Sequence, residues 1–320
     1  MLVLDTDSSG RSPRMLNTTR LRILREVAAR GTITAAAEAL YLTPPAVSHQ
    51  LATLERELGV PLLERTGRSI ALTDAGKRLV VHAETILADC ERAVSDVTAF
   101  SEEVSGTVRI SVFQTAAQAI ALPAFVSLRK QYPKLEIVAR GLEPVNSLPA
   151  LRAGQLDIAL SHEWDFVPFT RDPSTDRIEL VEEPIRVLLP RNHALANESV
   201  SLRDLADEPW CVAHESAASR QAFDRVAQAA GFKPRIFLES NYFRAIGAAV
   251  EAGLGVGIAP AMTDLRGLRI AIRPLVQPKM RRRIFAAVRS GSGEAPAVRA
   301  VLEALLEASR TFEATARASN

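Results

Sequence analysis

Two helical patterns separated by only three residues constrain the fold of this chain more than any other feature of its sequence. The first, at residues 34–40, is a run of strong helix formers that the Thr34 hydroxyl can cap. The second begins at Pro44, where the missing proline N–H costs nothing, and continues to about residue 57. An earlier amphipathic pattern occupies residues 18–31. The spacing predicts three short helices, the last two joined by a tight turn.

The second helix of this pair has an apolar face and a polar face. Val47, Leu51 and Leu54 recur at spacings of four and three and share one side. The other side carries short polar or flat side chains near the helix start, which suits contact with base edges in the major groove of DNA. A hairpin predicted at 62–72 would form a wing whose arginines reach phosphates or the minor groove. The candidate DNA-binding residues are Thr43, Pro44, Pro45, Ser48, His49, Thr53, Arg65 and Arg68.

Periodicity alone would also describe an Ala-rich three-helix domain with a solvated polar face, but the detailed string favours DNA binding. Residues 36–65 read AAEALYLTPPAVSHQLATLERELGVPLLER. This string resembles the winged helix-turn-helix of LysR-type transcriptional regulators, and residues 72–76 (LTDAG) look like the family's junction with its linker helix. The resemblance implies that Pro45 and Ser48 lie at DNA, and that the two wing arginines meet the backbone or the minor groove.

Two positions depart from the pattern of the family. Pro44 stands where many members have Gln or Ser, and His49 stands where many have Arg or Gln. A histidine would read a base through one nitrogen only, without the bidentate contact that arginine makes to guanine. A solvated surface histidine is the alternative interpretation of His49.

A long amphipathic pattern at 73–104 predicts a dimerisation helix. It contains three basic and seven acidic residues, so its net charge is negative, like that of the DNA phosphates. We therefore expect this helix to pair with protein and not with DNA. The resemblance implies antiparallel pairing between two subunits, which would place Cys90 opposite its symmetry mate. A regulatory disulfide and a small apolar residue in a tight seam are both open for Cys90. The apolar seam, repeating at spacings of four and three, consists of Leu79, Ala83, Ile86, Cys90, Ala93, Val97 and Phe100.

From residue 107 onward, short strand patterns alternate with helical patterns, which predicts parallel sheets with helical crossovers. With the family resemblance, this implies a type 2 periplasmic-binding-protein-like α/β effector domain of two subdomains with a crevice between them. The whole chain is then a multidomain α+β protein. The predicted parts are an N-terminal arm at 1–14, the winged helix-turn-helix at 15–72, the linker helix at 73–104, subdomain I at 107–181 and 276–310, subdomain II at 182–275, and a C-terminal tail at 311–320.

Loop residues that follow strands are the candidate ligands of a small effector, because ligands of open α/β sheets bind at strand carboxyl ends. Each of them alone is equally consistent with a helix cap or a solvated loop. The family often binds carboxylates through hydroxyls and helix ends, which suggests Thr115 and Ser147. However, four acidic residues near the predicted crevice, Glu143, Glu163, Asp165 and Glu215, favour an amino acid or a cationic metabolite. The candidate effector-binding residues are Gln114, Thr115, Glu143, Ser147, Ser161, His162, His214, Ser216 and Ser240.

The composition and the sequence patterns of the chain argue against several other classes of protein. The chain has 320 residues, 47% of them hydrophobic, with a net charge of +2, which is ordinary for a globular protein. No apolar run reaches about 18 residues and the N-terminus lacks a signal pattern, so we expect a cytoplasmic protein with no membrane partner. Two cysteines, Cys90 and Cys211, have no metal-ligand spacing, and neither a metal nor a cofactor is expected.

Three other functions are weaker. An enzyme using Cys211 and His214 is disfavoured, because residues three apart on a strand point to opposite faces. A thiol or peroxide sensor of the same fold would need a resolving partner, and Cys90 and Cys211 fall in different predicted domains. An exported solute-binding protein would lack residues 15–72. We therefore expect a dimeric or tetrameric regulator of partly palindromic promoter DNA that responds to an effector, contacts RNA polymerase if it activates, and catalyses no reaction.

Overall fold

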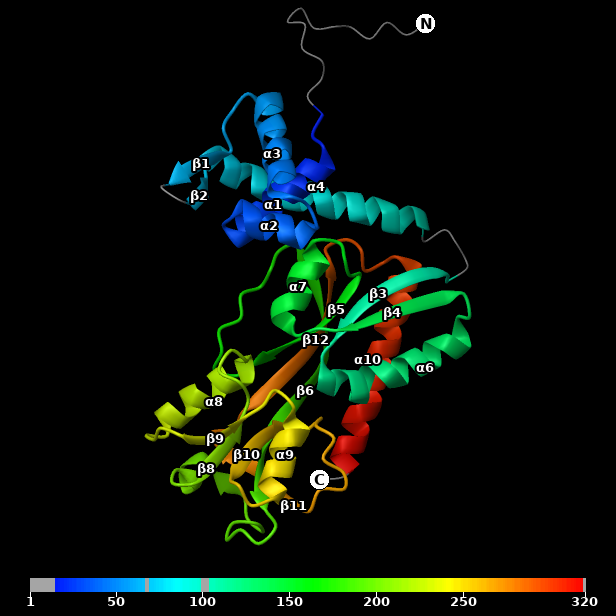
Figure 1. Cartoon of the computed structure of the whole chain (residues 1–320). Helices are drawn as coiled ribbons and strands as arrows, with labels where there is room; N and C mark the ends of the chain where they lie inside the picture. Colours follow the sequence, from blue (N-terminus) through cyan, green and yellow to red (C-terminus); the bar gives the residue numbers. More distant parts are fainter. Residues whose placement is uncertain (1–14, 67–68, 99–103, 319–320) are drawn as a thin grey trace, which may run out of the picture.

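A small helical unit lies at one end of a larger α/β domain, and the long helix α4 (Asp74–Thr98) runs between them (Figure 1). The computed structural model describes residues 15–66, 69–98 and 104–318. The expected arm at 1–14, the wing residue Arg68 and the seam residue Phe100 lie outside these ranges. The predicted multidomain α+β organisation is confirmed.

Side-chain caps set where the N-terminal helices begin. Asn17 accepts the N–H of Arg20 at 3.2 Å. The second helix starts earlier than predicted, because Thr32, not Thr34, has extended backbone and its hydroxyl accepts the N–H of Ala35. The three helices are α1 (Thr18–Arg30), α2 (Ile33–Leu40) and α3 (Pro44–Leu58), and the hairpin of β1 (Leu63–Thr66) and β2 (Ser69–Leu72) follows.

One apolar core holds this unit together. The predicted inner face of α3, Val47, Leu51 and Leu54, is buried against Leu24 of α1 and Ala37 of α2. Burial of each large side chain of this kind contributes about 1.5–3 kcal/mol to the free energy of unfolding. The outer face of α3 therefore remains free for contacts with another molecule.

The C-terminal α/β domain, which the sequence predicts to bind an effector, is built on one continuous sheet that passes through two subdomains. Its strand order is β4-β3-β5-β12-β6-β10-β8-β9, with β11 beside β6 and β7 beside β11. Subdomain I contains β3 (Gly106–Val112), α5 (Gln114–Ala116), the π-helical turn η1 (Ala117–Ala121), α6 (Leu122–Gln131), β4 (Leu135–Gly141), α7 (Pro144–Arg152), β5 (Ile158–Trp164), the first half of β6 (Thr175–Pro190), β12 (Arg281–Arg289) and α10 (Pro296–Ala318).

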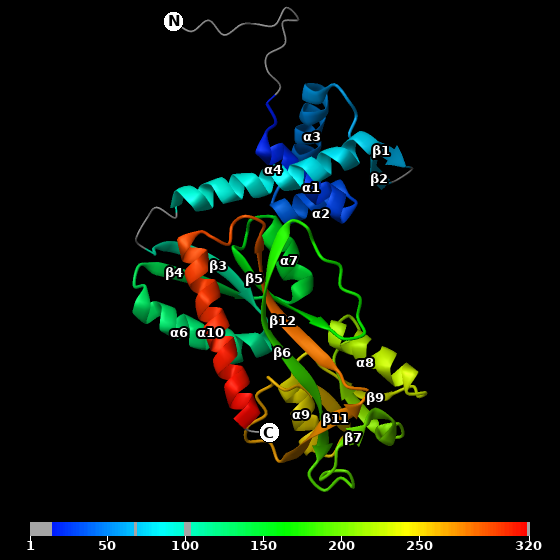
Figure 2. The ribbon, with the colours of Figure 1, turned by 180° about the vertical axis from the view of Figure 1, so that it is seen from behind.

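Subdomain II is formed by the second half of β6 and the segment that follows it. It contains β7 (Val200–Ser201), η2 (Leu202–Leu205), β8 (Pro209–Val212), α8 (Ala218–Ala229), β9 (Arg235–Glu239), α9 (Phe243–Glu251), β10 (Val256–Pro260) and β11 (Ile270–Gln277). In the view from behind, α10 lies along α6 on the outer side of subdomain I (Figure 2). The expectation of a separate tail at 311–320 is wrong, because α10 continues through residue 318 and its Phe312 packs against the core of subdomain I.

The chain crosses between the subdomains on β6 and just before β12. β6 pairs with β12 as far as Pro184, and with β10 from Ile185 onward. The return crossing lies between Gln277, the end of β11, and Arg281, the start of β12. These crossings lie a few residues beyond the boundaries expected at 181 and 276. Two adjacent strand segments therefore connect the halves at one narrow place, here called the hinge.

Candidate DNA-binding and effector-binding sites

The start of α3 presents the predicted recognition residues to solvent. Thr43 caps the helix by accepting the N–H of Ala46 at 3.3 Å, and its neighbours Pro44, Pro45, Ser48 and His49 are exposed. Because the helix axis and its inner face are held by the core, these side chains project as one rigid surface. The arrangement suits insertion of the helix start into a groove.

Thr53 is less available than the pattern suggested. Its hydroxyl donates to the carbonyl oxygen of His49 at 2.9 Å and accepts from Arg56 Nη2 at 2.8 Å. Both bonds lie within α3, so Thr53 positions Arg56 on the exposed side of the helix. Arg56, which the sequence analysis did not select, therefore extends the polar surface as a cation.

The wing is attached directly to the recognition helix. Glu55 Oε1 accepts the backbone N–H groups of Leu62 and Leu63 at 2.7 and 3.0 Å. The backbone of Arg65 lies in β1 opposite Ile70. A carboxylate that satisfies two N–H groups at the start of a strand fixes the angle between α3 and the hairpin.

The predicted seam on α4 divides into two parts. Leu79 packs against the core of the N-terminal unit and Ala83 is 0% exposed, so this chain itself covers the first part. This burial does not fit a role for Ala83 in contact with another chain. Ile86 is half-buried, whereas Cys90, Ala93 and Val97 are exposed, and Val97 reaches 72%. Only the second part of the seam is open to a partner.

A cavity of about 410 Å³ lies between the two subdomains. Among the predicted effector residues, Gln114, Thr115, Glu143, His162 and Ser216 line it. Most of the remaining wall is apolar, and the sequence analysis missed it because aromatic and aliphatic residues at strand ends look like core residues. Those apolar residues are Phe113, Pro144, Val145, Leu148, Trp164, Val167, Pro168, Phe169, Ala213, Ala217, Ala218 and Phe243.

Four predicted effector residues do not line this cavity. Ser161 is buried on the face of β5 opposite to His162, and Ser147 is buried on the inner side of α7. Ser240 accepts the N–H of Tyr242 at 3.1 Å and so stabilises the start of α9. His214 contacts the Ser216 hydroxyl through Nδ1 at 3.0 Å, which holds its own loop together. The helix-cap or loop interpretation therefore fits Ser240 and His214, whereas Ser147 and Ser161 are buried and neither cap a helix nor lie in a solvated loop.

Arg282 forms the floor of the cavity at the hinge, where it belongs to a buried ion pair with Glu183. Arg282 Nε donates to Glu183 Oε1 at 2.8 Å, and Arg282 Nη2 donates to the Thr115 hydroxyl at 2.8 Å. The other carboxylate oxygen of Glu183 accepts the N–H of Met262 at 2.5 Å. Arg282 and Glu183 are almost fully buried. The positive charge on the floor is therefore already compensated, and sequence reasoning missed both residues because they lie inside strands.

His162 is neutral and points a fixed donor toward Glu143. Burial, assisted by the charge of Arg282, lowers the pKa of His162 to about 3. Its Nδ1 accepts the indole N–H of Trp164 at 3.2 Å, which leaves the proton on Nε2, 4.0 Å from Glu143 Oε2. Burial also raises the pKa of Glu143 above its ordinary value.

The expectation that several acidic residues line the crevice is wrong. Of the four acidic residues, only Glu143 lines the cavity. Glu163 accepts hydrogen bonds from Arg177 and Arg283, and Asp165 forms an ion pair with Arg283 at 3.1 Å. Because arginines neutralise these carboxylates outside the cavity, they give no preference for a cationic effector.

The cysteines and metal-ligating residues show no reactive arrangement within the described ranges. Cys211 is fully buried in β8, and burial raises the pKa of its thiol, which opposes thiolate formation. Cys90 lies on α4, outside the effector domain. No group of three His, Cys, Asp or Glu residues in these ranges lies close enough to hold a metal ion. No described helix is both long and apolar enough to span a bilayer.

His162 makes part of the free energy of unfolding depend on pH. The folded chain keeps His162 neutral down to about pH 3, whereas the unfolded chain binds a proton near the ordinary value of 6.5. Acidification through this window favours the unfolded state, so we expect urea titrations to show a loss of stability from pH 7 to pH 5. The His162→Gln variant should lose less. His49→Gln, which removes an exposed histidine, should keep the wild-type slope, and equal slopes for wild type and His162→Gln would contradict the neutral imidazole.

Two family models match the chain. The model of the bacterial regulatory helix-turn-helix protein, lysR family, matches residues 18–77, and the LysR substrate binding domain matches residues 101–310. Among curated proteins, the transcriptional dual regulator GltC of Bacillus subtilis (strain 168) is 32% identical over 246 residues, which are 76% of this chain and 80% of GltC.

Solved structures share the fold at lower identity. A full-length OxyR from Pseudomonas aeruginosa superimposes with a TM-score of 0.60 at 21% identity, over 91% of this chain and 98% of that one. Full-length CbnR complexed with its target DNA gives a TM-score of 0.53 at 23% identity, over 92% and 100%. The two matched models together span most of this sequence, and the chain belongs to the LysR family of transcriptional regulators, with a helix-turn-helix and an effector-binding domain.

Proposed function

We propose that this regulator binds a partly palindromic promoter site as a dimer or a dimer of dimers, with one α3 helix in the major groove of each half-site. The observation that carries this proposal is the exposed face at the start of α3, where Pro45, Ser48 and His49 project from a helix whose opposite face is buried. A small molecule in the cavity between the subdomains then shifts the population of arrangements that place the two α3 helices.

The cellular location and a further protein partner follow from this role. A regulator of promoters acts in the cytoplasm, and it contacts RNA polymerase if it activates transcription. CbnR, which has the same fold, has been solved as a complex with its target DNA. That likeness supports binding of DNA by this chain as well.

Footprinting on the upstream intergenic DNA tests the role of α3. Each lost base contact costs about 1–3 kcal/mol, so we expect Ser48→Ala to weaken protection about tenfold at constant salt. Ser199→Ala, which removes an exposed hydroxyl in subdomain II, is the matched control and should protect the site like wild type. Equal protection by wild type and Ser48→Ala would show that the Ser48 hydroxyl makes no contact that contributes to DNA binding. Absence of binding by the wild-type protein anywhere in the genome would overturn the proposed function.

The exposed part of α4 is the proposed dimer contact. An aspartate at position 97 would place a charge in this apolar seam, so we expect Val97→Asp to shift the dimer toward monomer in sedimentation experiments. Val81 is exposed on another side of the same helix, so Val81→Asp is the matched control and should remain dimeric. A dimer that withstands Val97→Asp would show that the subunits meet elsewhere.

The cavity suits an effector with an apolar body and one or two polar groups. Phe113, Phe169 and Phe243 supply its aromatic walls, and the compensated Arg282 gives no strong demand for a charge. The polar ends of such a molecule would meet the Thr115 hydroxyl and the His162 Nε2–H.

Trp164 provides a reporter for binding in the cavity. The chain has two tryptophans, and in a Trp210→Phe variant the emission would come from Trp164 alone. We expect the apolar probe anilinonaphthalenesulfonate to change this emission, and Phe169→Ala to weaken its binding about tenfold through lost apolar contact. Phe237, which is exposed outside the cavity, gives the control Phe237→Ala. Equal probe affinity in both variants would place the binding elsewhere.

A further inference from the structure

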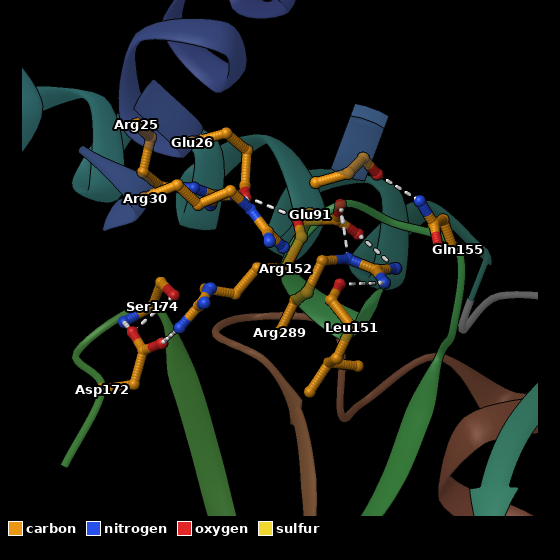
Figure 3. A network of polar contacts seen from close by, with 11 residues as sticks. Arg25, Glu26, Arg30, Glu91, Leu151, Arg152, Gln155, Asp172, Ser174 and Arg289 are labelled. Atoms are coloured by element: carbon orange, nitrogen blue, oxygen red, sulfur yellow. Dashed lines mark hydrogen bonds and ion pairs between the residues drawn. The ribbon is translucent and has the colours of Figure 1, made fainter. Parts of the chain in front are cut away.

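The N-terminal unit is bonded to subdomain I of its own chain. Arg25 and Glu26 on α1 are charged and yet buried, at 7% and 0% exposure. Arg25 Nη2 donates to the carbonyl oxygen of Arg152, the last residue of α7, at 2.6 Å. Just beyond α7, Gln155 Nε2 donates to the carbonyl oxygen of Ala39 in α2 (Figure 3). Two backbone carbonyls, one on each side, therefore hold the DNA-binding unit to the end of α7.

The linker helix adds a second set of contacts. Arg289, at the end of β12, donates through Nε to Glu91 Oε1 of α4 at 3.0 Å (Figure 3). Gly291 has a φ of +86°, and a Cβ at this position would collide with the carbonyl oxygen of Ala88. A void of only about 10 Å³ remains between α1, α4 and the effector domain, enough for at most one water molecule. The interface is thus packed closely.

The same structural elements also line the effector cavity. Pro144, Val145 and Leu148 of α7 form part of its wall, while the other end of this helix carries the Arg25 contact. The loop after β5 also reaches from the cavity toward the end of α7. Its residues Val167 and Phe169 line the cavity. Farther along that loop, Asp172 accepts from Arg152 Nη1 at 2.6 Å and from the Ser174 hydroxyl at 2.7 Å (Figure 3).

We propose that α7 is the link through which the occupancy of the effector cavity controls how the DNA-binding unit docks on subdomain I of the same chain. This inference rests on the proposed function, since it assigns a route between the two sites. Each bond at the end of α7 joins a long side chain to a backbone carbonyl of the other unit, and the close packing around Gly291 and the small void leaves these side chains little room to adjust. A shift of α7 must therefore move α1 and α2, and with them α3, or break the docking.

Charged side chains surround the small void between the domains. Burial, and next the Asp172 carboxylate, raise the pKa of Glu84, which lies on α4 at the small void between the domains. The other groups around it are the cations Arg22, Arg25 and Arg289 and the acid Glu91. Arginines of α1 and β12 therefore face acidic residues of α4 across this small void, so charge contributes to the contact between the two domains.

Hydrogen exchange of the full chain without DNA or effector tests the docking. Gly291→Ala forces α4 away from the effector domain, so we expect amides at residues 22–26 to exchange at least about tenfold faster. Gly267, at a φ of +85° with open space around its Cβ position, gives the control Gly267→Ala, which has the same backbone strain without the collision. Exchange at 22–26 that is equal in these two variants would overturn the docking.

A second pair of variants distinguishes loss of the docking from a general loss of folding. Gln155→Glu replaces the donor to Ala39 by an acceptor, and Gln131→Glu makes the same change at an exposed position on α6. We expect faster exchange at 22–26 only in Gln155→Glu, with the same thermal unfolding midpoint in both. Unchanged exchange in Gln155→Glu also counts against the docking.

Acrylamide quenching of Trp164 in a Trp210→Phe background tests the transmission. If α7 links the two sites, release of the docking by Gly291→Ala should change the quenching constant of the cavity tryptophan about twofold, and Gly267→Ala should not. Faster exchange at 22–26 without a change in quenching would overturn the link while leaving the docking intact. Neither readout involves DNA, so a failed footprint counts against the proposed function alone.

Discussion

The effector domain depends on the buried ion pair between Arg282 and Glu183. Two charges removed from water are tolerated only when every donor and acceptor is satisfied, and breaking such a pair costs about 3–5 kcal/mol. Here Arg282 donates to Glu183 and to Thr115, and the remaining oxygen of Glu183 accepts the N–H of Met262. Because the pair lies where β6 and β12 pass between the subdomains, it fixes the position of the hinge and the floor of the cavity together.

This constraint also determines the chemistry of the cavity. The guanidinium of Arg282 helps to keep His162 neutral, and the indole of Trp164 selects which imidazole nitrogen carries the proton. The floor therefore offers fixed hydrogen-bond donors rather than a free charge. Apolar walls supply most of the remaining contact area, so an effector would be recognised by its shape and by a few acceptors.

The linker helix shows why a periodic pattern is not sufficient to name a partner. The seam from Leu79 to Val97 is regular in sequence, and a heptad repeat predicts burial of every member. In the structure, α1 of the same chain covers Ala83, and Val97 remains exposed. The repeat identified an apolar face correctly, but whether that face meets the same chain or another one depends on contacts between residues far apart in sequence.

The sequence by itself determined the fold class and the recognition helix, because local signals carry them. Thr43 and Pro44 mark the start of α3, the spacing of Val47, Leu51 and Leu54 chooses its buried side, and the outer side follows by exclusion. Alternating patterns likewise predicted the α/β part of the chain, and the family resemblance supplied its two subdomains and their crevice. Together they placed Gln114, Thr115, Glu143, His162 and Ser216 at the cavity.

Only the tertiary structure decided the remaining contacts. In the structure, the cavity wall does not include Ser147, Ser161, His214 and Ser240, whereas Arg282 lies at the cavity floor. Arg25 contacts the end of α7. Each of these depends on which of two faces a side chain takes, or on a meeting of segments more than a hundred positions apart, as with Arg25 and Arg152. Local periodicity acts over a few residues along one element, and it contains no information about which distant element will cover that face.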